Sequence, residues 1–149
     1  MILADLIRWI QDTPYSHVFF KIENDNLRNH LFYHASGSKV NFMGTNLFFS
    51  KNIPIKMFEF EIDEQAFYKF LDAAIDRVGM KYSLLQLVGF PIATLFRLKR
   101  NPFGKKGYVC SELVAEVLKE VRNFSFDKDL SLVDLKDIYN LLSNENNTI

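Results

Sequence analysis

Apolar residues recur every three or four positions in four stretches of the chain. Residues at that spacing share one face of a helix, so the pattern predicts four amphipathic helices. Asp63 or Glu64 precedes one of them as an N-terminal cap. A third apolar face begins directly after Cys110, with charged residues left between the apolar ones. The helices are expected at 3–11, 64–78, 110–121 and 130–142.

Three other stretches have the pattern of strands. The segments 15–22 and 30–35 are rich in β-branched and aromatic residues. The segment 55–62 alternates apolar and charged residues, which predicts a strand with one wet face. The stretch 39–49 is ambiguous, with a further strand expected around 40–42.

The first two strands are expected to form an antiparallel hairpin. Asp25 and Asn26 tolerate left-handed backbone conformations and therefore predict a two-residue turn. With that turn, His17 falls directly opposite His34, and directly paired residues share a face of the sheet. A longer loop through Asn29 would shift this register.

The most apolar part of the chain is 84–98. It is shorter than the about 20 residues that cross a bilayer, so it predicts a buried helix, broken near 89–91 and mostly core. The alternative is a lining for an acyl chain or a membrane contact. The basic residues that follow it indicate a solvated loop or, as the alternative, a surface for an anionic substrate or lipid. They are Arg97, Lys99, Arg100, Lys105 and Lys106.

The composition favours one globular domain, 1–149, because 48% of the 149 residues are hydrophobic. A formal net charge of zero gives no reason to expect nucleic acid as a partner. One cysteine can form neither an internal disulfide nor a cysteine-rich metal site, so no metal and no cofactor is expected. The first residues contain Asp5 and no basic lead-in, which is unlike a signal peptide and favours a cytoplasmic location.

The single cysteine has two interpretations. Cys110 lies in the first turn of its predicted helix, where free backbone N–H groups and the helix dipole favour a thiolate. It also lies four residues before Val114, on the apolar face, and free cysteine is among the most buried residue types. A reactive cysteine needs a base nearby, so the search for that base decides between nucleophile and core residue.

Two of the three histidines, His17 and His34, occupy paired positions of the predicted hairpin. A thiol hydrolase needs a nucleophile, an imidazole that accepts its proton and a polar group that orients the imidazole. Cys110, His17 and His34 supply one of each. His30 has the strand parity of His34 but lies nearer the turn, and it is left out of the set.

Two blocks of the sequence carry a family resemblance. Tyr-Ser-His-Val at 15–18, followed by His-Ala-Ser-Gly at 34–37, precedes Tyr-Val-Cys-Ser-Glu-Leu-Val at 108–114. This order resembles the permuted branch of the NlpC/P60 papain-like superfamily, which includes the YiiX-like proteins and the relatives of lecithin:retinol acyltransferase. Weaker similarity is found at 5–10, 79–83 and 132–135.

The resemblance implies a papain-like α+β fold in which a small antiparallel sheet packs against the cysteine helix. It implies that Cys110 is the nucleophile, that His17 is the base and that His34 orients the base. Several YiiX-like proteins have a carboxylate at the third position, whereas His34 is closer to the acyltransferase pattern. The Cys110 backbone N–H would bind the oxyanion. Tyr108, Tyr15 and Ser16 are candidate substrate contacts.

The function predicted first is a cysteine peptidase or amidase that cleaves a peptide or peptidoglycan-type amide through an acyl-Cys110 intermediate. Its partner would be a peptide- or amide-containing substrate, with membrane contact as a secondary alternative. A lipid acyltransferase or thioesterase with the same Cys-His-His set is the second hypothesis, and the apolar run with its basic loop favours it. The third is a binding protein that kept the fold and lost the activity.

Overall fold

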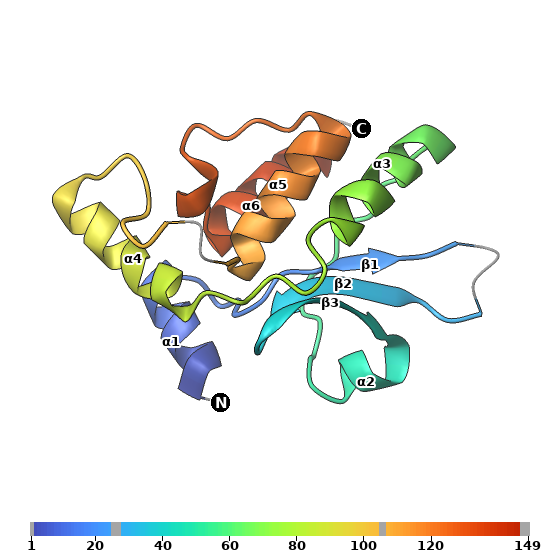
Figure 1. The fold of residues 1–149 in the computed structure, drawn as a ribbon, viewed down its shortest axis with the longest axis horizontal. Helices are drawn as coiled ribbons and strands as arrows, with labels where there is room; N and C mark the ends of the chain where they lie inside the picture. Colours follow the sequence, from blue (N-terminus) through green and yellow to red (C-terminus); the bar gives the residue numbers. More distant parts are fainter. Residues whose placement is uncertain (1, 25–27, 105–106, 147–149) are drawn as a thin grey trace.

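The computed structural model describes residues 2–24, 28–104 and 107–146. Within them the chain has an α+β fold in which helices surround one small antiparallel sheet (Figure 1). The helices are α1 Ile2–Gln11, α2 Thr45–Phe49, α3 Glu64–Ile75, α4 Leu84–Phe96, α5 Cys110–Arg122 and α6 Leu135–Asn146, with a 3-10 turn, η1, at Leu130–Leu132. The strands are β1 Phe20–Ile22, β2 Leu31–Ser36 and β3 Lys39–Gly44.

The four predicted helices are present, but the last one begins at Leu135, five residues later than expected, after the 3-10 turn η1. The Asp63 side chain caps α3, accepting a hydrogen bond of 2.7 Å from the backbone N–H of Ala66, as the sequence predicts. The helix ends at Ile75, earlier than expected. The ambiguous stretch 39–49 divides into a strand, β3, and a short helix, α2, that the sequence did not predict.

The sheet has the order β1-β2-β3, and both pairs of neighbours are antiparallel. A tight turn through Gly37, whose φ is +66°, joins β2 to β3, and glycine adopts that backbone conformation without strain. The strand β2 is therefore central, and β1 is an edge strand. The predicted turn at Asp25 and Asn26 lies outside the described residues.

The direct pairing of His17 with His34 is wrong. The strand β1 begins only at Phe20, and continuing its ladder would place Phe19 opposite His34. The connection between the two strands, 23–30, is longer than a two-residue turn, and this difference in length shifts the register. A shift of two residues keeps side chains on the same face, because side chains alternate with a period of two.

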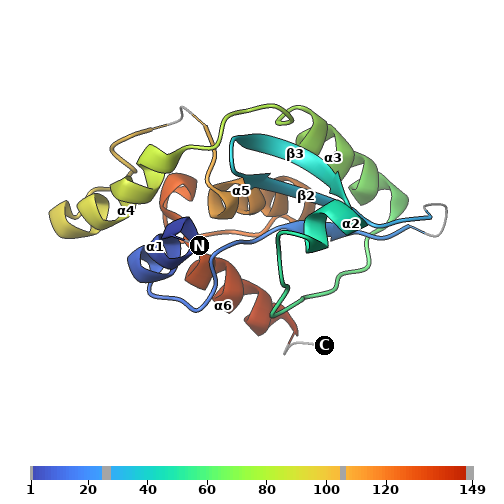
Figure 2. The same cartoon turned by 90° about the horizontal axis from the view of Figure 1, so that it is seen from below.

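The two faces of β2 meet different helices. Tyr33 and Ala35 are fully buried in the core that α3 and α5 form, together with Leu113. Phe32 points the other way and stacks on Phe48 of α2, with ring centroids 4.0 Å apart. Figure 2 shows α2 on one side of the sheet and α5 on the other. His34 has the parity of Phe32 and therefore lies on the α2 face.

The predicted strand at 55–62 is wrong. Within the described residues, the segment is neither helix nor strand and pairs with no strand. Its alternation still has a structural reason, because Phe58 and Phe60 pack toward the core beside α5 and α6. Residues of the segment and of the edge strand β1 both line the cavity described below.

The apolar run 84–98 corrects two expectations. Pro91 lies inside α4 without breaking it. Most of the run is not core, because only five of its residues are buried: Gln86, Leu87, Gly89, Phe90 and Ala93. A Cβ at Gly89 would lie 1.9 Å from the side-chain oxygen of Asn101, so a glycine is required there. Among the described residues, no helix is both long enough and apolar enough to cross a membrane.

Candidate functional site

The two histidines of the predicted set are in contact. His17 Nε2 and His34 Nδ1 are 2.9 Å apart, and the rings meet edge to face. One ring must donate and the other accept, so at least one of the two imidazoles is neutral. His34 is 1% exposed and has the ring of Phe48 against it. The pair is thus held on the α2 face of the sheet by aromatic packing.

Both histidines are uncharged near neutral pH. Burial, together with repulsion from His34, lowers the pKa of His17 to about 3. Burial also lowers the pKa of His34; the side chain of Asn41, its cross-strand partner, opposes this effect, and Lys51 adds to it. In the described part of the chain, no hydrogen bond of ordinary geometry reaches His34 Nε2. A neutral imidazole is the form that can accept a proton.

Cys110 is the first residue of α5, as the sequence predicts, but its thiol is sealed. It is 2% exposed. Burial raises the pKa of the Cys110 thiol, whereas the backbone N–H groups of Val18, Ser111 and Cys110 itself and the hydroxyl of Tyr82 act in the opposite direction. Desolvation is the largest of these effects, so the thiol is protonated at neutral pH. The thiolate expected at a helix start is therefore not the form that this environment favours.

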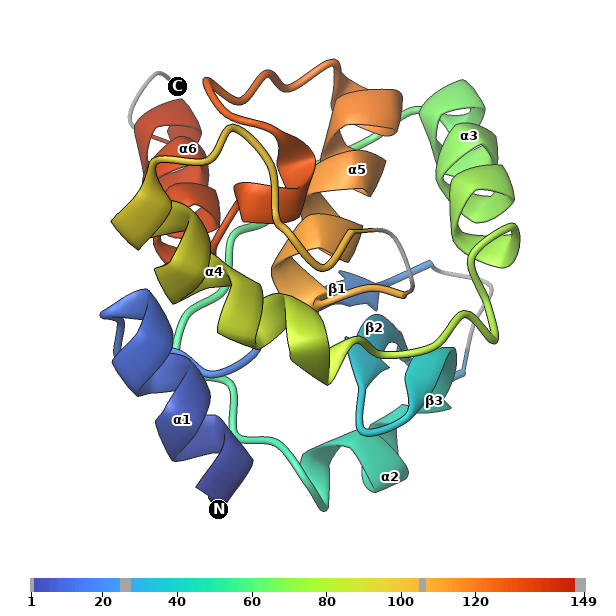
Figure 3. The same cartoon turned by 60° about the vertical axis from the view of Figure 1, so that its left-hand side comes forward.

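Side chains of α1, α4 and α6 cover Cys110. Ile7 of α1, Leu87 and Phe90 of α4, and Leu135 of α6 form one buried cluster with it. The polar link between α4 and α5 is a hydrogen bond of 2.9 Å from Gln86 Nε2 to the buried carboxylate of Glu112. Figure 3 shows α4 passing by the start of α5, with α1 beside α4. The two helices therefore form a lid over the thiol.

Among the described residues, the hydrogen bonds of Cys110 do not include the histidine pair. The reason lies in the sheet, because α5 packs on the face of β2 that carries Tyr33, whereas His34 points to the α2 face. His34 therefore does not share the face of β2 on which α5 packs, and the expectation that Cys110 faces both histidines stays a prediction. The nearest link is Val18, which directly follows His17 and whose N–H approaches the thiol.

The three predicted substrate contacts lie in different surroundings. Tyr15 lines the same cavity as His17 and stacks on Tyr139, with centroids 5.4 Å apart. Ser16 is half-buried and is not part of the cavity wall. Tyr108 is directed elsewhere, because its hydroxyl donates to the Glu116 carboxylate at 2.7 Å.

Sequence reasoning missed two residues that contact the candidate set. Tyr82 interacts with the thiol of Cys110, and burial raises the pKa of its own hydroxyl, with a contribution from Cys110. Asn41 lies opposite His34 in the β2–β3 ladder. The only sequence signal for Tyr82 is its place in the block 79–83, and no pattern marks Asn41 before the register is known.

A cavity of about 950 Å³ lies between β1, the segment 56–62 and the helices α3, α5 and α6. His17 lines it, and Cys110 does not. Its wall is largely aromatic and aliphatic, with Lys21, Glu59 and Arg122 among its charged members. The volume is in the range of small-molecule sites.

The described part of the chain holds no group of three or more His, Cys, Asp or Glu side chains that could bind a metal ion. No protein-family model, curated protein or solved structure matches this chain.

Proposed function

We propose that the protein is a cysteine hydrolase with Cys110 as nucleophile, His17 as base and His34 as the residue that orients the base. One observation carries the proposal. His17 is hydrogen-bonded to His34 at 2.9 Å, and the next residue, Val18, approaches the thiol at the start of α5. A thiol at a helix start and a neutral imidazole pair, one member of which directly precedes Val18 in the chain, are the components of acyl transfer through cysteine.

The observed arrangement is then a resting form. The His17 Cα is only two bonds from the Val18 nitrogen that approaches the thiol. Residues 15–19 belong to neither a helix nor a strand, so the His17 side chain can change rotamer without breaking a ladder. If the His17 ring rotated toward Cys110 around the free edge of β1, the two side chains would form the catalytic dyad. His34 would keep its place in the central strand.

The reaction follows from these roles. His17 takes the proton of the Cys110 thiol, and the sulfur attacks the carbonyl carbon of an amide. The backbone N–H of Cys110 stabilises the oxyanion, and the protonated His17 gives its proton to the leaving amine. Water, with His17 again as base, then attacks the acyl-Cys110 thioester and releases the acid and the free thiol.

The proposal is tested by trapping the acyl-enzyme. The chain is incubated with activated amide substrates, and the mass of intact protein is measured. Addition of an acyl group on Cys110 that His17→Gln lowers by about a hundredfold or more supports the proposal. His30→Gln is the matched control, since His30 is exposed and lies 3.6 Å from Glu23. Acylation that is equal in both variants would show that His17 is no base.

A lipid acyltransferase or thioesterase with the same residues is the second candidate, favoured by the cavity. Its aromatic wall includes Phe20, Phe58, Phe60 and Phe70, and its volume of about 950 Å³ suits an acyl chain. The exposure of much of α4 also removes the reason for treating the run 84–98 as core alone.

A cavity-filling substitution separates the two bond classes. Val121 lines the cavity at the far end of α5 from Cys110. Val121→Trp should slow the turnover of a long-chain acyl thioester and leave an acetyl thioester or a short peptide amide unchanged. Equal effects on all three substrates would contradict the hypothesis that the cavity binds an acyl chain. If none of them acylated Cys110, a binding protein without activity would be favoured.

A further inference from the structure

The helix α4 is apolar on two opposite faces. Its inner face buries Leu87, Phe90 and Ala93 against the core. Its outer face exposes apolar side chains in one broad stripe, at positions one, five, eight and twelve of the helix, with others beside it. These residues are Leu84, Leu85, Val88, Pro91, Leu95 and Phe96. A helix that is apolar all round is normally covered on every side, and the outer face of α4 is not.

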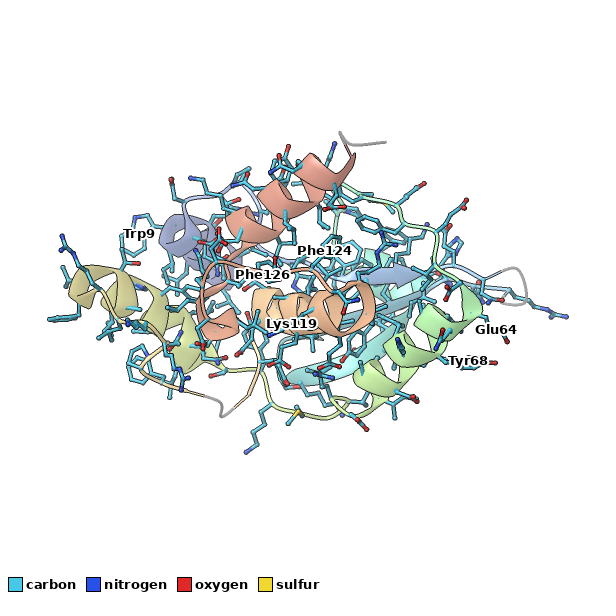
Figure 4. All side chains as sticks on the ribbon, turned by 90° about the horizontal axis from the view of Figure 1, so that it is seen from above. Trp9, Glu64, Tyr68, Lys119, Phe124 and Phe126 are labelled. Carbon is cyan, nitrogen blue, oxygen red and sulfur yellow. The ribbon has the colours of Figure 1, made fainter. Side chains whose placement is uncertain are left out.

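The neighbouring helix α1 extends this surface. Trp9 is 79% exposed, which is unusual for the largest apolar side chain, and Leu3 and Leu6 are exposed as well. Figure 4 shows Trp9 at the end of the molecule where α1 and α4 lie together. Within α4, Leu95 and Phe96 are 75% and 67% exposed. We call the exposed apolar residues of α1 and α4 the α1–α4 face.

Basic residues border this face at the end of α4. Arg97, Lys99 and Arg100 are exposed, and the segment 84–104 contains no acidic residue. Arg100 is 3.5 Å from Asp129 but keeps 84% of its side chain in solvent. A stripe of large apolar side chains bordered by cations matches a layer of acyl chains below anionic headgroups.

We propose that the α1–α4 face docks on an anionic lipid bilayer, with α4 lying in the plane of the interface. At 13 residues, α4 is too short to span a bilayer, but its outer stripe can enter the headgroup and acyl boundary. Tryptophan is enriched at that depth because its ring is amphipathic. The basic residues then contact the anionic headgroups. The docking needs no chemistry at Cys110 and is independent of the proposed function.

Trp9 gives a direct readout, because it is the only tryptophan in the chain. The full chain is mixed with vesicles of phosphatidylcholine with phosphatidylserine, or of phosphatidylcholine alone. Binding is measured by co-sedimentation and by the Trp9 emission maximum. We expect binding to the anionic vesicles with a blue shift of Trp9, weakened by salt. Anionic binding without any shift of Trp9 would place the contact elsewhere and overturn the proposal.

Two variants and a control complete the test. Arg97→Gln, Lys99→Gln and Arg100→Gln together should weaken binding by at least about tenfold. Leu95→Gln with Phe96→Gln should reduce the Trp9 shift. The control replaces Lys39, Lys69 and Lys119 by Gln, which removes the same charge from other exposed sites, and should bind like the original chain. An equal loss of vesicle binding in the control would show that only net charge matters, and it would overturn the proposed docking face.

A second copy of the chain is the competing occupant. Sedimentation velocity without lipid measures self-association. A dimer that Leu95→Gln with Phe96→Gln dissociates, in a chain that does not bind anionic vesicles, would show that the face joins two protomers and would overturn the membrane proposal. Cys110→Ser should bind vesicles like the original chain, so a loss of acyl-enzyme formation and a loss of docking are distinguishable.

Discussion

The cysteine and the histidine pair lie in two differently built regions. Burial raises the pKa of the cysteine and lowers the pKa values of the histidines. Around Cys110, aliphatic side chains of α1 and α4 raise the pKa of an acid. Around His17 and His34, aromatic rings on the α2 face lower the pKa of two bases. In both regions burial favours the uncharged form. Moving a proton from the thiol to His17 would create a buried thiolate and a half-buried imidazolium, both of which these surroundings disfavour, so we expect catalysis to require that one of the regions opens.

The largest expected effect comes from removing the aromatic cover of the histidine pair. Phe48 is fully buried, and its ring contacts both Phe32 and His34. Phe48→Ala should lower the free energy of unfolding by about 3–5 kcal/mol. It should also let the imidazole pKa values rise toward the ordinary range, because water would enter. Urea unfolding and NMR titration measure the two effects.

The matched control for that variant lies in the same short helix. Leu47 is 53% exposed, so Leu47→Ala should change the free energy of unfolding by less than about 1 kcal/mol. If both variants lost equal stability, the packing between α2 and the sheet would not be what holds His34.

Removing the cover of the cysteine should have a somewhat smaller effect on stability. Leu87 of α4 is 2% exposed and belongs to the cluster around Cys110. Leu87→Ala should cost about 3 kcal/mol and make the thiol react faster with iodoacetamide, with a midpoint at lower pH than in the original chain. Val88→Ala, at an exposed position of the same helix, should change neither. An unchanged alkylation rate in Leu87→Ala would mean that α4 is not the lid.

The free energy of unfolding measured below neutral pH reports on the surroundings of His17. Its pKa falls from 6.5 to about 3 on folding, so the unfolded chain binds more protons between these values. The free energy of unfolding should therefore decrease as the pH falls through this window and be fully recovered above it. His17→Gln should flatten this dependence, and His30→Gln should leave it unchanged. A profile that is the same in all three proteins would show that His17 is not buried in the folded chain.

The smallest expected effect comes from one hydroxyl beside the thiol. Tyr82 lowers the pKa of Cys110 against the effect of burial. Tyr82→Phe removes that hydroxyl and should move the midpoint of alkylation to higher pH, with a change of about 1 kcal/mol or less in the free energy of unfolding. A midpoint that moves to lower pH would mean that Tyr82 hinders the thiolate.

Local patterns predicted the helices well and the sheet poorly. The amphipathic period after Cys110 and the cap at Asp63 depend on neighbours in sequence, and both are present. The predicted strand at 55–62 and the predicted helix break at Pro91 are wrong because both depend on residues distant in sequence. A strand needs a partner edge, and a proline inside a helix can be tolerated when tertiary packing holds the flanking turns. Neither condition is visible in a local window.

In the candidate site, too, local patterns were predictable from the sequence and tertiary contacts were not. The residue types and the parity of His17 and His34 were enough to predict that the two rings share a face, and they meet at 2.9 Å. The length of the connection 23–30 decided the register, and the register decided which residue lies opposite His34. Tyr82 and Asn41 entered the site only through the fold.

The sequence by itself determined the helical periods, the α+β class, the place of Cys110 at a helix start and the placement of two histidines on one face of the sheet. These follow from spacing and alternation, which are properties of neighbouring residues. Only the tertiary structure decided that α5 and His34 lie against opposite faces of β2, that α1 and α4 seal the thiol, and that the outer face of α4 is uncovered. Burial depends on which elements pack together, so residues distant in sequence set both the charge state of Cys110 and the exposure of α4.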